Sequence, residues 1–156
     1  MNGANQCGTY LQHIQAEHHR LNRVLAEIGR QFAIASCETS TQAMLRSIRD
    51  GLEDLLNELR RHFAEEEGGG CLDEAAARCP SLGPRARDLL HEHPHLDREL
   101  ERLISTMKTG EGDGKAWQYR FETFAADLRA HECAENQVLQ TAFGGEAADH
   151  DVEGNE

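Results

Sequence analysis

The sequence has few basic residues and no long apolar segment, and each absence excludes a class of protein. Sixteen Lys and Arg stand against 28 Asp and Glu, a net charge of −12, which argues against nucleic acid or an anionic membrane surface as a partner. No apolar run approaches the roughly 20 residues of a transmembrane helix. Residues 1–11 show neither the basic nor the apolar part of a secretion signal. We therefore expect a cytoplasmic protein with no membrane contact.

A disulfide framework is also missing from the sequence. The five cysteines are odd in number and scattered, which is typical of a protein in a reduced cytosol. Cys71 and Cys79 share one connecting segment, where a disulfide or an oxidant-sensing pair is a minor alternative. Cys133 is expected to be a small buried residue rather than a redox partner.

What the sequence does have is apolar residues repeated every three or four positions in four long segments. This spacing is typical of helices that each bury one side in a bundle. The length of 156 residues fits one domain, so the expected fold is all-α, an antiparallel up-down-up-down four-helix bundle. Residues 8–143 would form this domain, with a flexible N-terminus at 1–7 and a disordered acidic tail at 144–156.

The connections between these helical segments carry recognisable signals. The polar segment 37–41 supplies an N-cap for the second helix, and the glycines at 68–70 end that helix. The longest connection, 71–84, contains a short helical segment at 72–78. Pro94 lies within the third helix and predicts a kink or a local break there, because proline lacks the backbone N–H.

Each helical segment carries one histidine on its apolar side, and two of the segments carry a glutamate four residues after it. Two stretches of the form L-R-x-H-x-x-x-E make the latter pattern. Residues four apart lie on one side of a helix, so each pair can bind one metal ion. At about 1.5 Å of rise per residue, the histidines of all four helices fall in one layer of the core. The six predicted metal ligands are His18, His62, Glu66, His93, His131 and Glu135.

The ligand types limit the metal. Burying four imidazoles and two carboxylates without compensation would cost several kcal/mol for each ion, so a metal site is favoured over a purely hydrogen-bonded layer. With no thiolate in the set, zinc–thiolate and iron–sulfur centres are excluded. Six ligands suit two metals bridged by Glu66 and Glu135, with an oxo or hydroxo bridge from solvent. Both metals would be alike, each with an open position; iron is expected, and manganese and zinc are alternatives.

Two residues beside this set are alternatives to its members. Glu65 could replace or supplement Glu66, although it lies one residue off the apolar side of its helix. His19 could replace His18, but the helical spacing favours His18.

These motifs resemble the hemerythrin-like, or HHE cation-binding, family over residues 8–143. The resemblance is carried by E-H-x-x-L at 17–21 and 92–96, H-F-A-E-E at 62–66 and H-x-x-x-E at 131–135. It implies a non-haem di-iron centre in which the four predicted histidines are terminal ligands and the two predicted glutamates are bridges.

One position departs from the oxygen-carrying hemerythrins. These proteins have a further histidine one turn before the ligand of the third helix, where this chain has Leu89. The set of four histidines and two glutamates is similar to that of the Repair of Iron Centres proteins, which are linked to nitrosative and oxidative stress.

The sequence therefore predicts a metal-binding or sensing protein that binds or reacts with O₂, NO or H₂O₂. One alternative is an iron-handling or iron-centre repair protein, whose partner would be an apo iron protein. The other is an NO or peroxide reductase. The latter needs an external electron donor, because the sequence shows no flavin, haem or nicotinamide site. An enzyme is the less favoured interpretation.

Overall fold

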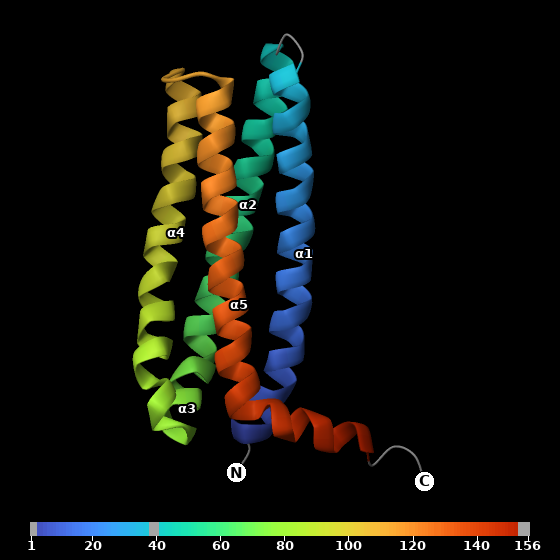
Figure 1. Ribbon diagram of the computed structural model, residues 1–156, viewed down its shortest axis with the longest axis vertical. Helices are drawn as coiled ribbons and strands as arrows, with labels where there is room; N and C mark the ends of the chain where they lie inside the picture. Colours follow the sequence, from blue (N-terminus) through green and yellow to red (C-terminus); the bar gives the residue numbers. More distant parts are fainter. Residues whose placement is uncertain (1–2, 38–40, 153–156) are drawn as a thin grey trace.

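The computed structural model describes the backbone of residues 3–37 and 41–152 and the side chains of residues 7–36 and 41–144. The described residues form helices and turns and include no strand, so the all-α class is confirmed. The long helices lie side by side (Figure 1). In the order of the chain the elements are α1 (Gly3–Cys37), α2 (Gln42–Gly69), α3 (Cys71–Arg78), η1 (Pro80–Leu82), α4 (Gly83–Thr109) and α5 (Gly114–Val152).

The helices form a bundle in which α1 packs mainly against α2 and α5, and α4 packs mainly against the same two helices. The short helix α3 closes one end of the bundle, where it contacts α4 and α5 (Figure 1). Every long helix therefore borders two others, and a side chain on its inner face meets residues from both neighbours.

The ends of the helices follow the expected local signals. Thr41 is the N-cap of α2, and its hydroxyl oxygen accepts a hydrogen bond from the backbone N–H of Met44 at 3.2 Å. Gly70, with φ of 65°, ends α2 in the left-handed conformation that glycine adopts without steric cost. Gly110, with φ of 73°, ends α4 in the same way. The N-cap predicted within 37–41 is thus confirmed at Thr41, whereas residues 38–40 lie outside the described part.

Of the kink or local break predicted at Pro94, the break is wrong, and the kink stays a prediction. Helix α4 runs without interruption from Gly83 to Thr109 with Pro94 inside it. Proline removes the hydrogen bond to the carbonyl four residues earlier, and its ring crowds that carbonyl. On either side of it, Leu89 and Leu96 are buried in the core, so their packing holds the helix together across the missing bond.

The helices extend beyond the predicted domain limits at both ends. Helix α1 begins at Gly3, and α5 continues to Val152, with its last part turned away from the bundle (Figure 1). The side chains of residues 1–6 and 145–156 lie outside the described part, so the boundaries at 8 and 143 stay a prediction. None of the described helices combines the length and the apolar character needed to cross a membrane.

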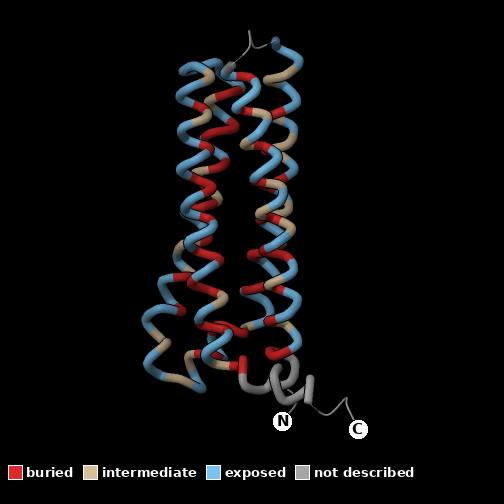
Figure 2. Tube along the Cα trace, turned by 45° about the vertical axis from the view of Figure 1, so that its right-hand side comes forward, coloured by how far each residue is buried: buried red, intermediate tan, exposed pale blue. Residues whose placement is uncertain are grey.

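Buried residues follow the inward sides of the long helices (Figure 2). They form two apolar clusters along the bundle, a larger one that includes Leu52, Leu100 and Leu128 and a smaller one that includes Leu11 and Leu89. Between the two clusters lies a set of buried polar residues from all four long helices, which we call the polar layer. It consists of Glu17, His18, His62, Glu66, His93, His131, Glu132 and Glu135.

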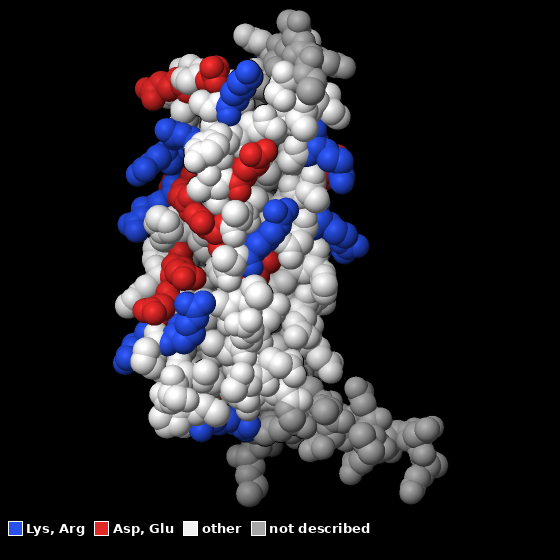
Figure 3. Space-filling model, viewed as in Figure 1, with Lys and Arg blue, Asp and Glu red and all other residues white. Residues whose placement is uncertain are grey.

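Charged side chains on the face shown in Figure 3 are of both signs and interspersed along the bundle. On the surface, Arg60 Nε lies 2.7 Å from Asp97 Oδ2, and Lys108 Nζ lies 2.6 Å from Glu53 Oε1. Exposed ion pairs of this kind contribute about 0–1 kcal/mol each. The stability of the bundle therefore depends on the two apolar clusters rather than on surface charge.

Replacing Gly70 by alanine should destabilise the protein. A Cβ at this position meets no atom within 4 Å, so the cost is the backbone strain of a left-handed alanine, about 1–2 kcal/mol. Gly68 is the matched control, because it lies within α2 and a Cβ there also meets open space. Gly68→Ala should raise the free energy of unfolding by roughly 0.5–1 kcal/mol. Urea denaturation of both variants measures the difference, and equal effects would contradict this account.

Candidate metal centre

All six residues predicted as ligands meet in the polar layer. Their nitrogen and oxygen atoms form two groups of four, and both groups include Glu66 and Glu135. Within each group, one ligand atom from every residue lies within 4.8 Å of the others. All six residues are 3% exposed or less. The histidines are His18 and His62 in one group and His93 and His131 in the other.

Each glutamate reaches one histidine of either group, as a carboxylate bridging two metals would. Glu135 Oε1 lies 3.5 Å from His18 Nε2, and Glu135 Oε2 lies 3.2 Å from His131 Nε2. In the same way, Glu66 Oε1 contacts His62 Nε2, and Glu66 Oε2 lies 3.1 Å from His93 Nε2. Two ligand atoms about 2.1 Å from one tetrahedral ion lie about 3.4 Å apart. The spacing at both contacts of Glu135 and at the contact of Glu66 with His93 therefore fits metal ligands.

None of these inward-facing atoms has a hydrogen-bond partner within the described part of the chain. The set comprises the Nε2 atoms of the four histidines and both oxygens of Glu66 and of Glu135. Buried polar atoms are nearly always hydrogen-bonded, whereas these atoms have only ion-pair contacts with one another, and moving such charges out of water costs several kcal/mol for each ion. Two metal ions would satisfy all eight atoms at once, so the residues present fit a dinuclear centre.

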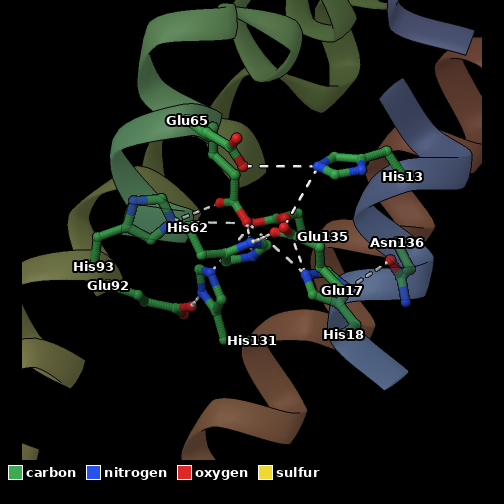
Figure 4. A network of polar contacts seen from close by, with 11 residues as sticks. His13, Glu17, His18, His62, Glu65, Glu92, His93, His131, Glu135 and Asn136 are labelled. Atoms are coloured by element: carbon green, nitrogen blue, oxygen red, sulfur yellow. Dashed lines mark hydrogen bonds and ion pairs between the residues drawn. The ribbon is translucent and has the colours of Figure 1, made fainter. Parts of the chain in front are cut away.

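The opposite nitrogen of each histidine is hydrogen-bonded. His62 Nδ1–H donates to Glu17 Oε2 at 2.5 Å, and His131 Nδ1–H donates to Glu92 Oε2 at 2.6 Å (Figure 4). A carboxylate acceptor at Nδ1 fixes the tautomer in which the lone pair of Nε2 faces inward, which is the form that binds a metal. In the sequence, each of these glutamates directly precedes a histidine of the layer.

The other two histidines are held in the same way. His93 Nδ1–H donates to Glu67 Oε1 at 3.0 Å, and His18 Nδ1–H donates to Asn136 Oδ1 at 2.9 Å. Each of these acceptors directly follows one of the two shared glutamates in the sequence. The sequence did not predict the four acceptors. A signal in the sequence could have revealed them. In each long helix a polar residue stands directly beside a predicted ligand, before the histidine in α1 and α4 and after the glutamate in α2 and α5.

The predicted alternatives lie outside the inner set. The side chain of Glu65 is 44% exposed, and His19 is exposed. Cys133 is exposed as well, so the prediction that it is buried is wrong, since it lies on the outer side of α5. Cys71 is buried, Cys79 is half-buried, and both are free thiols.

The carboxylates determine the charge of the histidines in the metal-free protein. Burial by itself would lower the pKa of His18, but the nearby Glu135 and Glu66 carboxylates raise that pKa to about 10. Burial also opposes protonation of His93, and the same two carboxylates raise the pKa of His93 to about 10. These imidazoles therefore carry protons at neutral pH, and metal binding must displace the protons.

The two halves of the layer have different surroundings. The Phe63 ring stacks on His93, with 4.0 Å between the ring centroids and 6° between the planes. Phe63 directly follows His62, and the residue that directly follows His131 is Glu132. Glu132 is 3% exposed, neither of its oxygens has a hydrogen-bond partner in the described part, and it borders an open cleft of about 400 Å³ beside His18.

Comparison with known proteins agrees with this arrangement. The family model described as the hemerythrin HHE cation binding domain matches residues 9–143, a range that includes all six predicted ligands. The chain belongs to the hemerythrin HHE cation-binding family. Neither the curated proteins nor the solved structures provided a match.

In this hemerythrin-like protein, Glu132 should make stability depend on pH when no metal is bound. Burial raises the pKa of Glu132 from its usual value of 4.5 to about 7. The folded state therefore holds the proton more tightly, and the resulting stability is present below pH 4.5 and lost as the pH rises through 7. The loss corresponds to about 3 kcal/mol. Glu132→Gln removes this titration.

Chemical denaturation of the metal-free wild type and of Glu132→Gln between pH 4.5 and 8 measures this effect. The difference between the two free energies of unfolding should change by about 3 kcal/mol across that range, in favour of the variant at high pH. Parallel curves for the two proteins would show that Glu132 is not held in the neutral form.

Proposed function

We propose that the chain holds two iron ions in the core of an antiparallel, up-down-up-down four-helix bundle, and that this centre binds or reacts with O₂, NO or H₂O₂. The observation that carries the proposal is the set of eight inward-facing buried atoms without hydrogen bonds. The short connections after α1 and α4 support the antiparallel order, because a turn of a few residues leaves consecutive helices adjacent.

The residues of the layer would divide between the two ions. One ion would be held by the first pair of histidines and the other by the second pair, and both shared glutamates would bridge the ions. The acceptors at Nδ1 keep each imidazole oriented, and such partners tune affinity as well as position. The proposed ligands are His18 and His62 for one ion, His93 and His131 for the other, and Glu66 and Glu135 for both.

The protein provides fewer ligands than iron accepts. Two imidazoles and two carboxylate oxygens give four protein ligands to each ion, which leaves positions for an outside molecule. Leu89, where oxygen-carrying relatives have a histidine, is 0% exposed and belongs to the smaller apolar cluster. When bound, the iron ions would supply a redox-active Lewis acid at the open positions. The chain itself contributes the orientation of the imidazoles and the exclusion of bulk water.

A second candidate function is iron handling, including the repair of iron centres in an apo partner protein. The observation that favours it is the approach of Glu135 to His18 at 3.5 Å and of Glu66 to His93 at 3.1 Å. These carboxylates raise the pKa of both histidines in the metal-free protein, so protons compete with iron for the ligands. A third candidate is reduction of NO or peroxide with electrons from an external donor. Both candidates use the same centre and differ from the first in what the iron does after binding.

Metal analysis tests the centre itself. Protein produced with iron should contain about two iron ions per chain, and His62→Ala should lose at least one of them, because it removes a terminal ligand. His19→Ala is the matched control, since His19 is exposed and belongs to neither group of ligands. Wild-type protein without stoichiometric metal, or His62→Ala with unchanged iron, would overturn the proposal.

Optical spectra of the iron-loaded protein under nitrogen and under air distinguish the three functions. Reversible binding should produce a charge-transfer band under air that disappears when oxygen is removed. Reduction should consume more than one equivalent of NO or peroxide per centre when a reductant is supplied. Iron handling should transfer iron to an apo acceptor under mild conditions. A loaded centre that does none of these would contradict all three.

A further inference from the structure

A second cluster of metal-binding side chains lies beside the polar layer. His13 and Glu17 on α1 and Glu65 on α2 bring one imidazole nitrogen and two carboxylate oxygens within 4.8 Å of one another. Figure 4 shows these three side chains converging next to the inner ligands. The side chains of His13 and Glu65 are 51% and 44% exposed, so a dissolved cation can reach the cluster. We call this set the outer cluster.

The distances in the outer cluster are longer than hydrogen bonds and suit a shared ion. His13 Nε2 lies 3.4 Å from Glu17 Oε1 and 3.7 Å from Glu65 Oε2. A good N–H···O hydrogen bond spans about 2.7–3.2 Å. Two ligands of a tetrahedral ion at about 2.1 Å lie about 3.4 Å apart. One imidazole and two carboxylates form a ligand set suited to iron(II), manganese(II) or zinc(II).

Glu17 connects the outer cluster to the inner ligands. It is 9% exposed, and its two oxygens have different neighbours. Oε2 accepts the hydrogen bond from His62 Nδ1, and Oε1 faces His13 Nε2. A cation in the outer cluster would therefore lie one carboxylate away from an inner histidine. An ordinary surface ion pair would not need a buried carboxylate such as Glu17, whose two oxygens contact different histidines.

The outer cluster occurs in only one half of the layer. Glu92 corresponds to Glu17, because each precedes a layer histidine and each holds the histidine of the next long helix. Four residues before Glu92 the chain has Asp88 instead of a histidine. The position that corresponds to Glu65, directly before a shared glutamate, is the buried Ala134. The other half therefore has the exposed Asp88 in place of the imidazole and no carboxylate at the position that corresponds to Glu65.

We propose that His13, Glu17 and Glu65 form an outer, exchangeable site for a divalent cation, from which iron is passed to the inner centre on the His62 side. The passing of iron rests on the proposed function, whereas the outer cation site does not. The net charge of −12 raises the local concentration of cations around the chain. Exposed ligands allow fast exchange, and Glu17 then links the outer site to the inner one.

Calorimetric titration of the iron-loaded protein with Zn²⁺ tests the outer site. The wild type should bind one Zn²⁺ whose affinity falls about tenfold or more in the double variant His13→Ala, Glu65→Gln. The matched control is His95→Ala, Asp127→Asn, because His95, Glu99 and Asp127 form a similar exposed group without Glu17. The control should keep the Zn²⁺ that the first variant loses. Equal Zn²⁺ affinity in the wild type and the first variant would overturn the site.

Iron content measured in the same samples separates the two proposals. A Zn²⁺ equivalent that depends on His13 in a protein without inner iron would leave the outer site standing and refute the dinuclear centre. Inner iron together with equal Zn²⁺ binding in the wild type and in His13→Ala, Glu65→Gln would support the inner centre and refute the outer site. The rate at which iron(II) loads the metal-free protein then tests the transfer. It should be about tenfold lower in His13→Ala, Glu65→Gln than in the wild type, and an equal rate would overturn the transfer role.

Discussion

Four hydrogen bonds at the Nδ1 atoms of buried histidines are the interaction on which the rest of this structure depends. Because each Nδ1–H is held by an acceptor outside the ligand set, each Nε2 must face the middle of the bundle. The inward-facing atoms then have only one another as neighbours, imidazole against carboxylate and without a hydrogen bond, and removing these groups from water is costly. The two apolar clusters on either side supply the burial that offsets the cost, at roughly 25 cal/mol for each Å² of apolar surface.

These hydrogen bonds also join the long helices into a closed cycle. Each long helix provides the acceptor that holds the histidine of the next one around the bundle, and α5 returns to α1. The orientation of the histidines therefore depends on the packing of the helices, because a shift of any helix moves an acceptor that holds the histidine of another helix. The pairs are Glu17 with His62, Glu67 with His93, Glu92 with His131 and Asn136 with His18.

The spacing of apolar residues was sufficient to predict which histidines and glutamates meet in the core, but not the acceptors that hold the histidines; their role as metal ligands stays a prediction. Helical periodicity selected His18 over His19 because it assigns each residue to a side of its own helix, and the structure agrees. The acceptors depend on where two helices cross, and no single-helix pattern contains that information. Pro94 shows the same limit, since the local rule for proline predicted a break and packing on both sides of it prevailed. Which molecule meets the centre is likewise not encoded in periodicity.

The sequence also predicted two equivalent metal positions, and their surroundings differ. Phe63 covers His93, while the position corresponding to Phe63 is Glu132, a buried carboxylate next to the cleft at His18. If iron binds as proposed, the ion on the His18 side would have a polar, open approach, and the ion on the His93 side would lie under an aromatic ring. The outer cluster is on the His62 side as well. Charge and access would therefore favour one ion of the proposed pair for exchange and for outside ligands, although both ions would have the same kinds of protein ligand.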